Sequence, residues 1–465
     1  MRTLFFFCIS VLMSFFAGGC ISDDFTDSPS DVLAFSTDTL RFDTVFTDLG
    51  TPTARLKVFN RASKSINISS VMVRDDAGVF TINVDGVSGK VFRDVEIRPN
   101  DSIFVFVECF IDANGDVRPF KVEGNLDFVT NGVAQTVTLE AYGQNVRRMR
   151  GVTVEEDMTL TAEVPYVVFD TLRVASGATL TVEPGARVLF HDGAMLQVDG
   201  TLHAVGETGR MISFRGDRLD NVLPDTGYEI LAGQWQGVRF GASSFGNRME
   251  YVEMQSTVSG VVVDSCGVTD RSKLTIVNSW LHNSQGNVLR SEHANVSAYG
   301  CCFSDAGEAV VSLRGGIHDF VQCTLANYYL FAISPESILT MSHLSREDSS
   351  GVSNPLMKAQ FNNCIIYGIT PPITPGDLAG SEVYLHNVLL GVGGSDDDHF
   401  VSCLWDEDPL FETVRDKYIF DYRLKEDSPA LHAGNPEYAG GVCIMDMDGV
   451  DRLEGGAPAL GAYAR

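Results

Sequence analysis

Apolar and polar residues alternate in short runs between about residue 34 and residue 148. The segments Leu40–Phe46, Ala54–Phe59 and Ser102–Val107 are examples. A period of two places one set of side chains in a core and the other in solvent, which predicts β-strands. Polar clusters such as Asp75-Asp76-Ala77-Gly78 separate these runs and predict turns. The chain therefore begins its folded part with a series of short strands.

About seven such strands in roughly 110 residues are typical of an immunoglobulin-like β-sandwich. Val58-Phe59-Asn60-Arg61, followed by a Ser-Ile-Asn-Ile-Ser strand, also resembles the Ig-like modules that precede bacterial surface domains. We therefore expect an Ig-like β-sandwich over residues 34–148. It would serve either as a spacer that lifts the next domain or as a binding module.

The pattern changes after residue 149, where very short apolar runs are separated by glycines. Between residues 274 and 332 a spacing of 22 residues recurs in several columns. A fixed period predicts a solenoid, in which each coil stacks on the previous one at about 4.8 Å. The columns are Ser279, Cys301 and Cys323; Leu274 and Val296; Ile276, Ala298 and Phe320; Asn283, Asp305 and Asn327; and Val288, Val310 and Ala332.

The residue types in these columns indicate their positions in a coil. Apolar columns would point inward and form one continuous core. Asn283, Asp305 and Asn327 suit a turn, where stacked side chains would bond to one another as a ladder. Cys301, Cys323 and Cys364 would fill an inward column, as free buried thiols or, if oxidised, as disulfides.

Several segments resemble right-handed β-helix proteins of the pectate-lyase-like superfamily. They are the opening run 176–190, the strand motif 235–240, and a C-terminal series that includes 408–411, 427–434, 446–452 and 461–463. The resemblance implies an all-β chain in which a right-handed, single-stranded parallel β-helix spans residues 149–465. It also implies that a C-terminal closing segment caps the last coil. Two excursions, 217–233 and 334–359, would lie on the binding face.

The N-terminus has the form of a secretion signal over residues 1–19: Arg2, a short apolar run and then small residues. Ala17-Gly18-Gly19-Cys20 resembles a bacterial lipobox, which implies a lipid such as palmitate on Cys20. Ser22, Asp23 and Asp24 resemble the export signal of Bacteroidetes surface lipoproteins. We expect a lipidated, flexible tether over residues 20–33 and an outer-membrane protein that faces the cell exterior. A plain secretion signal and an ordinary acidic tether are the alternatives.

The chain carries 34 Lys and Arg against 61 Asp and Glu, a net charge of −27. Such a chain repels nucleic acid, and it repels polyanionic glycans unless calcium bridges the two. No cofactor is expected apart from calcium, for which Asp396, Asp397 and Asp398 in a glycine-rich loop supply hard oxygen donors. Asp446 and Asp448 look like half a calcium loop, although a structural role in the closing segment fits them better.

Candidate catalytic residues follow from the chemistry that the superfamily supports. A polysaccharide lyase needs a strong base, and Arg290 and Arg314 lie about one coil apart. A glycoside hydrolase needs two carboxylates, for which Asp264, Asp305 and Glu308 are candidates. A complete catalytic set does not emerge from the sequence.

We therefore expect a cell-surface lipoprotein that displays a β-helix to bind glycan or another surface ligand without cleaving it. The aromatic candidates for contact with sugar rings are Trp235, Trp280, Trp405, Tyr328 and Tyr329. The alternative is a lyase or hydrolase of polysaccharide. The extended surface of the fold favours a polymer ligand in either case.

Overall fold

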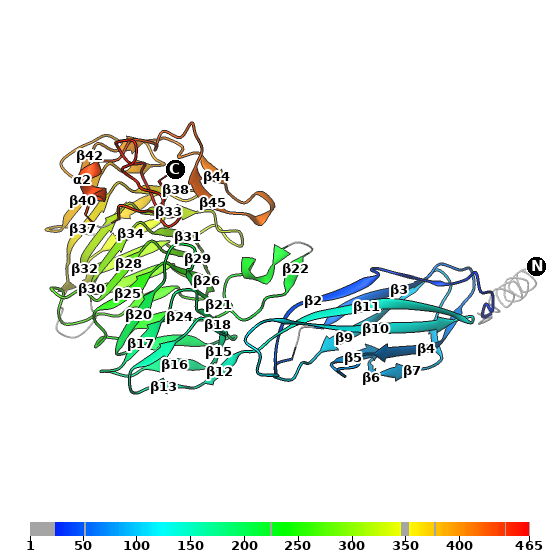
Figure 1. The fold of residues 1–465 in the computed structure, drawn as a ribbon. Helices are drawn as coiled ribbons and strands as arrows, with labels where there is room; N and C mark the ends of the chain where they lie inside the picture. The colour runs from blue at the N-terminus through cyan, green and yellow to red at the C-terminus, as the bar shows by residue number, and fades with distance from the viewer. Residues whose placement is uncertain are drawn as a thin grey trace, which may run out of the picture. The chain divides into compact units, whose positions relative to one another are not determined.

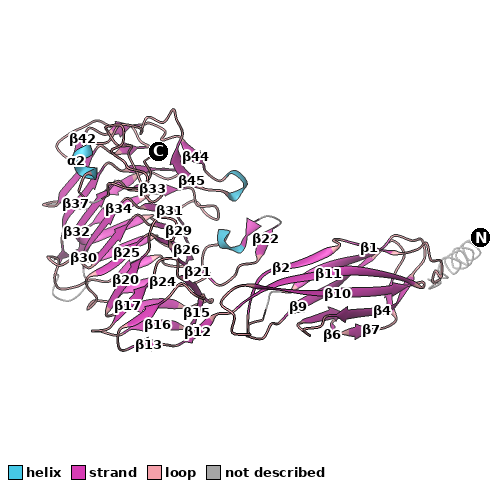
Figure 2. Cartoon of the chain, viewed as in Figure 1, coloured by secondary structure: helices cyan, strands magenta, loops and turns pink. Residues whose placement is uncertain are grey.

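The computed structural model describes residues 24–50, 53–223, 226–345, 353–375, 378–441 and 443–464. The chain divides into two compact units between Asn145 and Val146. Strands make up nearly all of the regular structure of both units (Figure 2). The expected signal peptide (1–19), Cys20, Ser22 and Asp23 lie outside the described residues.

The first unit contains two sheets that share one hydrophobic core (Figure 1). Strands β3 (Ala54–Asn60), β9 (Ser102–Cys109) and β5 (Phe80–Val84) pair in antiparallel fashion in one sheet, and β11 (Val133–Gln144), β10 (Phe120–Thr130) and β4 (Ile66–Arg74) do so in the other. Their inward residues, such as Leu56, Val58, Leu126 and Phe128, are fully buried, as the period of two predicts. The first sheet has the order β1 (Leu33–Phe35), β3 (Ala54–Asn60), β9 (Ser102–Cys109), β5 (Phe80–Val84), β6 (Val87–Gly89). The second has the order β2 (Thr39–Phe46), β11 (Val133–Gln144), β10 (Phe120–Thr130), β4 (Ile66–Arg74), β7 (Val91–Phe92), with β8 (Val95–Ile97) also on β4.

The described part of the expected tether belongs to this first unit. Phe25 forms a parallel bridge with Ser65, and the side chain of Asp24 lies 2.8 Å from Lys64. Leu33 is buried in β1. The folded unit therefore begins ahead of residue 34, because the segment from Asp24 pairs with the sheet instead of remaining free.

The second unit is built from two long parallel sheets, consistent with a β-helix (Figure 1). The 11-stranded sheet has the order β12 (Arg147–Arg150), β15 (Tyr166–Phe169), β18 (Arg187–Phe190), β21 (Ile212–Gly216), β26 (Val252–Thr257), β29 (Trp280–Ser284), β31 (Cys302–Ala306), β33 (Thr324–Asn327), β38 (Ile365–Gly368), β41 (Leu389–Leu390), β43 (Leu404–Trp405). The 17-stranded sheet contains β13 (Thr153–Val154), β14 (Met158–Leu160), β16 (Thr171–Val174), β17 (Thr179–Val182), β19 (Met195–Val198), β20 (Thr201–Val205), β24 (Gly237–Phe240), β25 (Asn247–Glu250), β27 (Val261–Val263), β28 (Leu274–Val277), β30 (Leu289–Tyr299), β32 (Val311–Val321), β34 (Leu339–Ser342), β37 (Leu356–Asn362), β39 (Ile373–Pro375), β40 (Glu382–His386), β42 (Phe400–Val401).

Short elements outside these sheets lie in the excursions and in the C-terminal segment. They are the hairpins β22 (Asn221–Leu223) with β23 (Thr226–Gly227), β35 (Leu344–Ser345) with β36 (Ser353–Asn354), and β44 (Phe411–Thr413) with β45 (Asp421–Leu424); the 3-10 turns η1 (Tyr228–Ile230) and η2 (Asp416–Tyr418); and the helix α2 (Pro436–Ala439).

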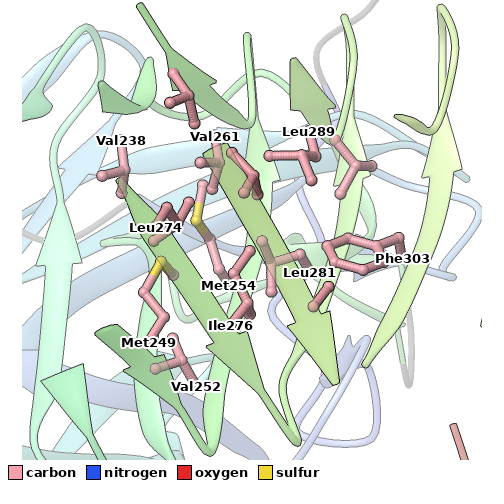
Figure 3. Packing of buried hydrophobic residues seen from close by; sticks show 14 of the residues in the cluster. Val238, Met249, Val252, Met254, Val261, Leu274, Ile276, Leu281, Leu289 and Phe303 are labelled. Atoms are coloured by element: carbon pink, nitrogen blue, oxygen red, sulfur yellow. The ribbon is translucent and has the colours of Figure 1, made fainter. Parts of the chain in front are cut away.

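The strand register confirms most of the 22-residue columns. Leu274 pairs with Val296, Ile276 pairs with Ala298, and Ala298 pairs with Phe320. Side chains from successive strands, among them Val238, Met254, Leu281 and Phe303, turn toward one another in the core (Figure 3). Cys301, Cys323 and Cys364 belong to the same buried core and carry free thiols. The inward cysteine column is thus confirmed.

Two details of the columns differ from the expectation. Ala332 does not continue the column of Val288 and Val310: Val311 pairs with Leu339 and donates its N–H to Ile338, because the intervening loop is longer than in the preceding coil. The side chains of Asn283, Asp305 and Asn327 do not form a ladder. Asn283 donates to carbonyls of the η1 turn, Asp305 accepts from Tyr422, and Asn327 bonds to the backbone of Ala306.

The C-terminal closing segment covers a sheet face as well as following the last coil. Its side chains Phe411, Tyr422 and Leu460 pack in one cluster with Cys302, Ala326, Ile365 and Leu389, which alternate with the inward residues of the 11-stranded sheet. The Thr324 hydroxyl accepts the backbone N–H of Ala462, and Gln322 donates to the carbonyl of Ala459. The segment therefore lies along the outer face of β31, β33 and β38.

Substitution of Phe320 tests how much the packing between neighbouring coils contributes to the stability of the second unit. Its ring lies 4.9 Å from that of Phe361 and 6.0 Å from that of Phe303. We expect Phe320→Ala to lower the free energy of unfolding by about 3–5 kcal/mol, measured by chemical denaturation, because the cavity disrupts three coils. Phe331→Ala is the matched control, since its side chain is 51% exposed. Equal losses for the two variants would contradict the packing described.

Candidate functional site

A hollow lined by aromatic and charged side chains lies on the outer face of the 11-stranded sheet. Its floor consists of outward residues from β26 and β29, namely Glu253, Gln255, Trp280 and His282. These residues alternate with inward core residues, so the period of two in each strand aims them away from the core. The parallel register sets Glu253 opposite Trp280 and Gln255 opposite His282.

Two segments distant in sequence form the walls of this hollow, which we call the sheet pocket. The excursion after β21 contributes Glu229 and Ile230, and the β44–β45 hairpin contributes Lys417 and Tyr418. Both segments extend from the same side of the second unit (Figure 1). Tyr329 is a further lining residue. The excursion over 217–233, which the sequence places on the binding face, thus supplies one wall.

The pocket has a volume of about 440 Å³. This falls within the range of about 300–1,000 Å³ that is common for small-ligand sites. The Trp280 and His282 rings stack with centroids 4.0 Å apart and planes inclined by 16°. Trp280 also donates to the Ser304 hydroxyl over 3.2 Å, which fixes the orientation of its ring. The two stacked aromatic rings are therefore held in place at the floor of the pocket.

Ionisable groups lie in pairs around the stacked rings. Glu253 lies 3.6 Å from the Nε2 atom of His282, and Arg215 lies 3.1 Å from Glu229. The contact with His282 lowers the pKa of Glu253, although burial acts in the opposite direction. Glu253 therefore stays ionised in the neutral pH range.

Asp305 lies at the edge of the pocket and fastens the C-terminal segment. The Tyr422 hydroxyl donates to both of its carboxylate oxygens, at 2.8 and 2.9 Å, and the backbone N–H of Tyr328 donates to one of them at 3.1 Å. Burial raises the pKa of Asp305 above its usual value. Its left-handed backbone, with φ of 64°, agrees with the turn position that the sequence predicts.

The candidate catalytic residues are divided between different places in the fold. Arg290 and Arg314 lie on β30 and β32 of the 17-stranded sheet, whereas Asp305 lies on β31 of the other sheet. The two arginines lie 3.8 and 3.3 Å from the same carboxylate, Glu292. They line a separate hollow together with Glu308. The arginine pair therefore has a carboxylate partner in the fold, which disfavours it as the base of a lyase.

The remaining hydrolase candidate, Asp264, pairs with Arg239 at 2.8 Å. Of the tryptophans, Trp235 is fully buried and stacks on Phe190 at 3.9 Å. Trp405 packs near Phe400 and donates to Asp396. Trp280 is thus the tryptophan that lies in the pocket.

The acidic loop proposed for calcium uses its carboxylates to fix its own backbone. Asp396 accepts from the backbone N–H groups of Ser402 and Cys403, and Asp397 accepts from those of His399 and Phe400. Asp398 is the third carboxylate of this acidic run. Asp446 likewise accepts from Val450 and Ala464 within the closing segment. Within the described ranges, no group of three or more His, Cys, Asp or Glu side chains has a geometry suited to a metal ion.

Sequence reasoning missed Glu253, His282 and Arg215. Each belongs to a strand with a recognisable alternation, so its outward position was readable in principle. The convergence of these residues on one pocket could not be predicted from the sequence. It depends on the insertion that sets β26 next to β21 and on a C-terminal hairpin that folds back across the sheet.

Comparisons with known proteins identify no family for this chain. No family model matches it, and no curated protein matches it. Among solved structures, a protein of unknown function from Porphyromonas gingivalis W83 has 15% identity and a TM-score of 0.19, covering 26% of this chain and 49% of that chain. This chain thus spans about half the length of that protein.

Two further solved structures have similarly low scores. A family 123 glycoside hydrolase from Clostridium perfringens, described in terms of glycolipid glycan hydrolysis, has 10% identity and a TM-score of 0.18 over 24% of this chain and 26% of that chain. The periplasmic chaperone SfaE has 14% identity and a TM-score of 0.19 over 29% of this chain and 71% of that chain. Similarities of this size carry no argument about function.

The raised pKa of Asp305 gives a test of its buried position. In the unfolded chain the carboxyl loses its proton near pH 4, whereas the folded chain retains the proton to a higher pH. The contribution of Asp305 to stability therefore falls as the pH rises through that window. We expect the unfolding free energy of the wild type minus that of Asp305→Asn to decrease as the pH is raised from about 4 toward 7.

Asp397→Asn is the matched control, because backbone N–H donors lower the pKa of Asp397. Its stabilising contribution is lost as the pH falls, so the same difference should increase with rising pH. Urea denaturation of the three proteins between pH 3 and pH 7 measures both trends. Parallel curves for the two variants would contradict the buried position of Asp305.

Proposed function

We propose that this protein is a lipid-anchored protein of the bacterial outer membrane that binds a glycan at the cell surface through the sheet pocket. The observation that carries the proposal is the aromatic floor of that pocket, formed by the stacked Trp280 and His282 rings. Sugar rings have apolar faces of C–H groups that pack on flat aromatic surfaces, while their hydroxyls bond to neighbouring polar groups. Glu253, Gln255 and Arg215 supply such polar groups at the floor.

The architecture that we infer for this role is an immunoglobulin-like sandwich followed by a right-handed parallel β-helix. Two sheets around one core in the first unit support the sandwich, and the stacked parallel strands of the second unit support the helix. The first unit would act as a spacer and the second as the binding domain. The net charge of −27 disfavours nucleic acid as the ligand.

A binding test follows directly. We expect Trp280→Ala and His282→Ala each to weaken binding of the preferred polysaccharide at least tenfold, about 1.4 kcal/mol, because each removes half of the stacked pair. A panel of neutral and acidic polysaccharides is first screened by affinity electrophoresis, and the best ligand is then measured by calorimetry. Trp405→Ala is the matched control, since Trp405 lies outside the sheet pocket. Unchanged affinity in both pocket variants would overturn the proposal.

Cleavage of the bound polysaccharide is the second candidate function. It is favoured by one observation: Glu253, His282 and Asp305 line the same pocket, and such groups serve in general acid–base catalysis. Product chromatography after incubation with the same panel separates the candidates. Unsaturated products would indicate a lyase, saturated products a hydrolase, and intact polymer would leave binding as the function.

The lipid anchor has its own test. We expect Cys20→Ser to abolish labelling by radioactive palmitate and to release the protein from the membrane fraction, because stable anchoring needs acyl chains. Cys8→Ser, within the proposed signal, is the control and should remain labelled. Replacement of Asp23 and Asp24 by Ala should leave the labelled protein inaccessible to protease added to intact cells, since these residues are the proposed export signal. An unlabelled wild-type chain would refute the anchor.

Among the described residues, no helix is long and apolar enough to cross the bilayer.

A further inference from the structure

The outer face of the five-stranded sheet in the first unit carries one exposed aromatic ring, Phe104, and two half-buried rings, Phe59 and Phe106, beside cations. Strands β3 and β9 pair in antiparallel register, with Lys57 opposite Phe104 and Arg55 opposite Phe106. Their inward partners, such as Val58 and Val105, are fully buried. The alternation therefore directs the aromatic and cationic residues to solvent.

These residues contact one another in a continuous patch. The Nζ atom of Lys57 lies 5.1 Å from the ring centre of Phe59 and 5.6 Å from that of Phe104. The guanidinium of Arg61 lies 5.4 Å from the ring centre of Phe59. The rings of Phe104 and Phe106 stack with centroids 6.1 Å apart. We call Arg55, Lys57, Phe59, Arg61, Phe104 and Phe106 the cationic-aromatic face.

The charge of this face is opposite to that of the whole chain. The outward positions of β3 and β9, taken together with Arg61, carry one carboxylate, Glu108, and three cations: Arg55, Lys57 and Arg61. The chain as a whole carries a net charge of −27. Phe104 is 46% exposed and its ring stacks on that of Phe106, so its apolar surface belongs to a patch and is not that of an isolated residue. Such a combination suits an anionic surface with an apolar layer beneath its charges.

We propose that the cationic-aromatic face docks on an anionic phospholipid surface. The cations would meet the lipid phosphates, and the phenylalanine rings would enter the boundary between headgroups and acyl chains. A free polyanionic glycan offers charge and the shallow C–H faces of its rings, whereas a lipid surface offers charge above a continuous apolar layer that an exposed ring can enter. The exposed ring of Phe104 therefore favours lipid.

The course of the chain supports the same occupant. Asp24 lies 2.8 Å from Lys64, and Phe25 bridges to Ser65, so the N-terminal segment meets the unit in the connection between β3 and β4, which also contains Arg61. The choice of occupant rests on the proposed anchor, since Cys20 precedes Asp24 by four residues. Four extended residues span at most about 14 Å, so a lipid on Cys20 would hold this end of the unit close to the bilayer.

Vesicle sedimentation of the lipid-free chain, residues 21–465, tests the proposal without the anchor. We expect at least tenfold more binding to vesicles of equal parts phosphatidylethanolamine and phosphatidylglycerol than to pure phosphatidylcholine. Binding to the anionic vesicles should weaken severalfold in 0.5 M NaCl, because salt screens exposed charges.

Two substitutions separate the ionic from the apolar contribution. Lys57→Gln and Phe104→Ser should each lower vesicle binding at least fivefold. Tyr142→Ser is the matched control, because Tyr142 is also 46% exposed but lies on β11 of the other sheet. Circular dichroism checks that all variants are folded, and Arg61→Gln is a further exposed substitution if Phe104→Ser fails to fold.

Equal binding to both kinds of vesicle, or binding that neither Lys57→Gln nor Phe104→Ser reduces, would overturn the proposal. Retention on immobilised polygalacturonate without binding to anionic vesicles would also overturn it and assign the face to an acidic glycan. The anchor fails separately: a chain that takes up no palmitate but still binds anionic vesicles would refute Cys20 lipidation and leave the docking face intact.

Discussion

The parallel pairing of successive coils is the constraint on which the second unit depends. A strand such as β31 bonds on one edge to β29 and on the other to β33, so each coil fixes the position of the next. Inward side chains must then fill the same interior at every level, which explains why Ile276, Ala298 and Phe320 follow one another in one column. The variation in their size is accommodated by neighbouring residues, since the core is close-packed.

The same stacking of coils also builds the outer face of the 11-stranded sheet, but the residue types on that face differ from coil to coil. Near β31, β33 and β38 its outward residues are Cys302, Ala326 and Ile365, which need cover, and the C-terminal segment supplies it. Near β26 and β29 they are Glu253, Trp280 and His282, which tolerate water. The pocket lies where the apolar cover ends, and Asp305 joins the two regions by holding Tyr422. Stability of the closing segment and shape of the pocket are thus physically coupled.

The sequence predicted the features that depend on local periodicity. The strand alternation of the first unit, the 22-residue columns and the buried cysteine column could all be read from residue types and spacing. The two departures have different causes. Ala332 left its column because one loop is longer than in the preceding coil. The closing segment lies along a sheet face because of contacts between segments far apart in sequence, which periodicity does not encode.

The distribution of charge links the two proposed surfaces. An acidic chain near an anionic membrane is repelled by it, and the repulsion extends over about a Debye length, roughly 8–10 Å in physiological salt. A cationic-aromatic face on the first unit offsets this repulsion locally, through Lys57 and its ring partners. In the pocket of the second unit, Arg215 pairs with Glu229, and Glu253 contacts the imidazole of His282. Glu253 and Glu229 place carboxylates at the proposed glycan site, so we infer that an uncharged sugar would suit it better than an acidic one.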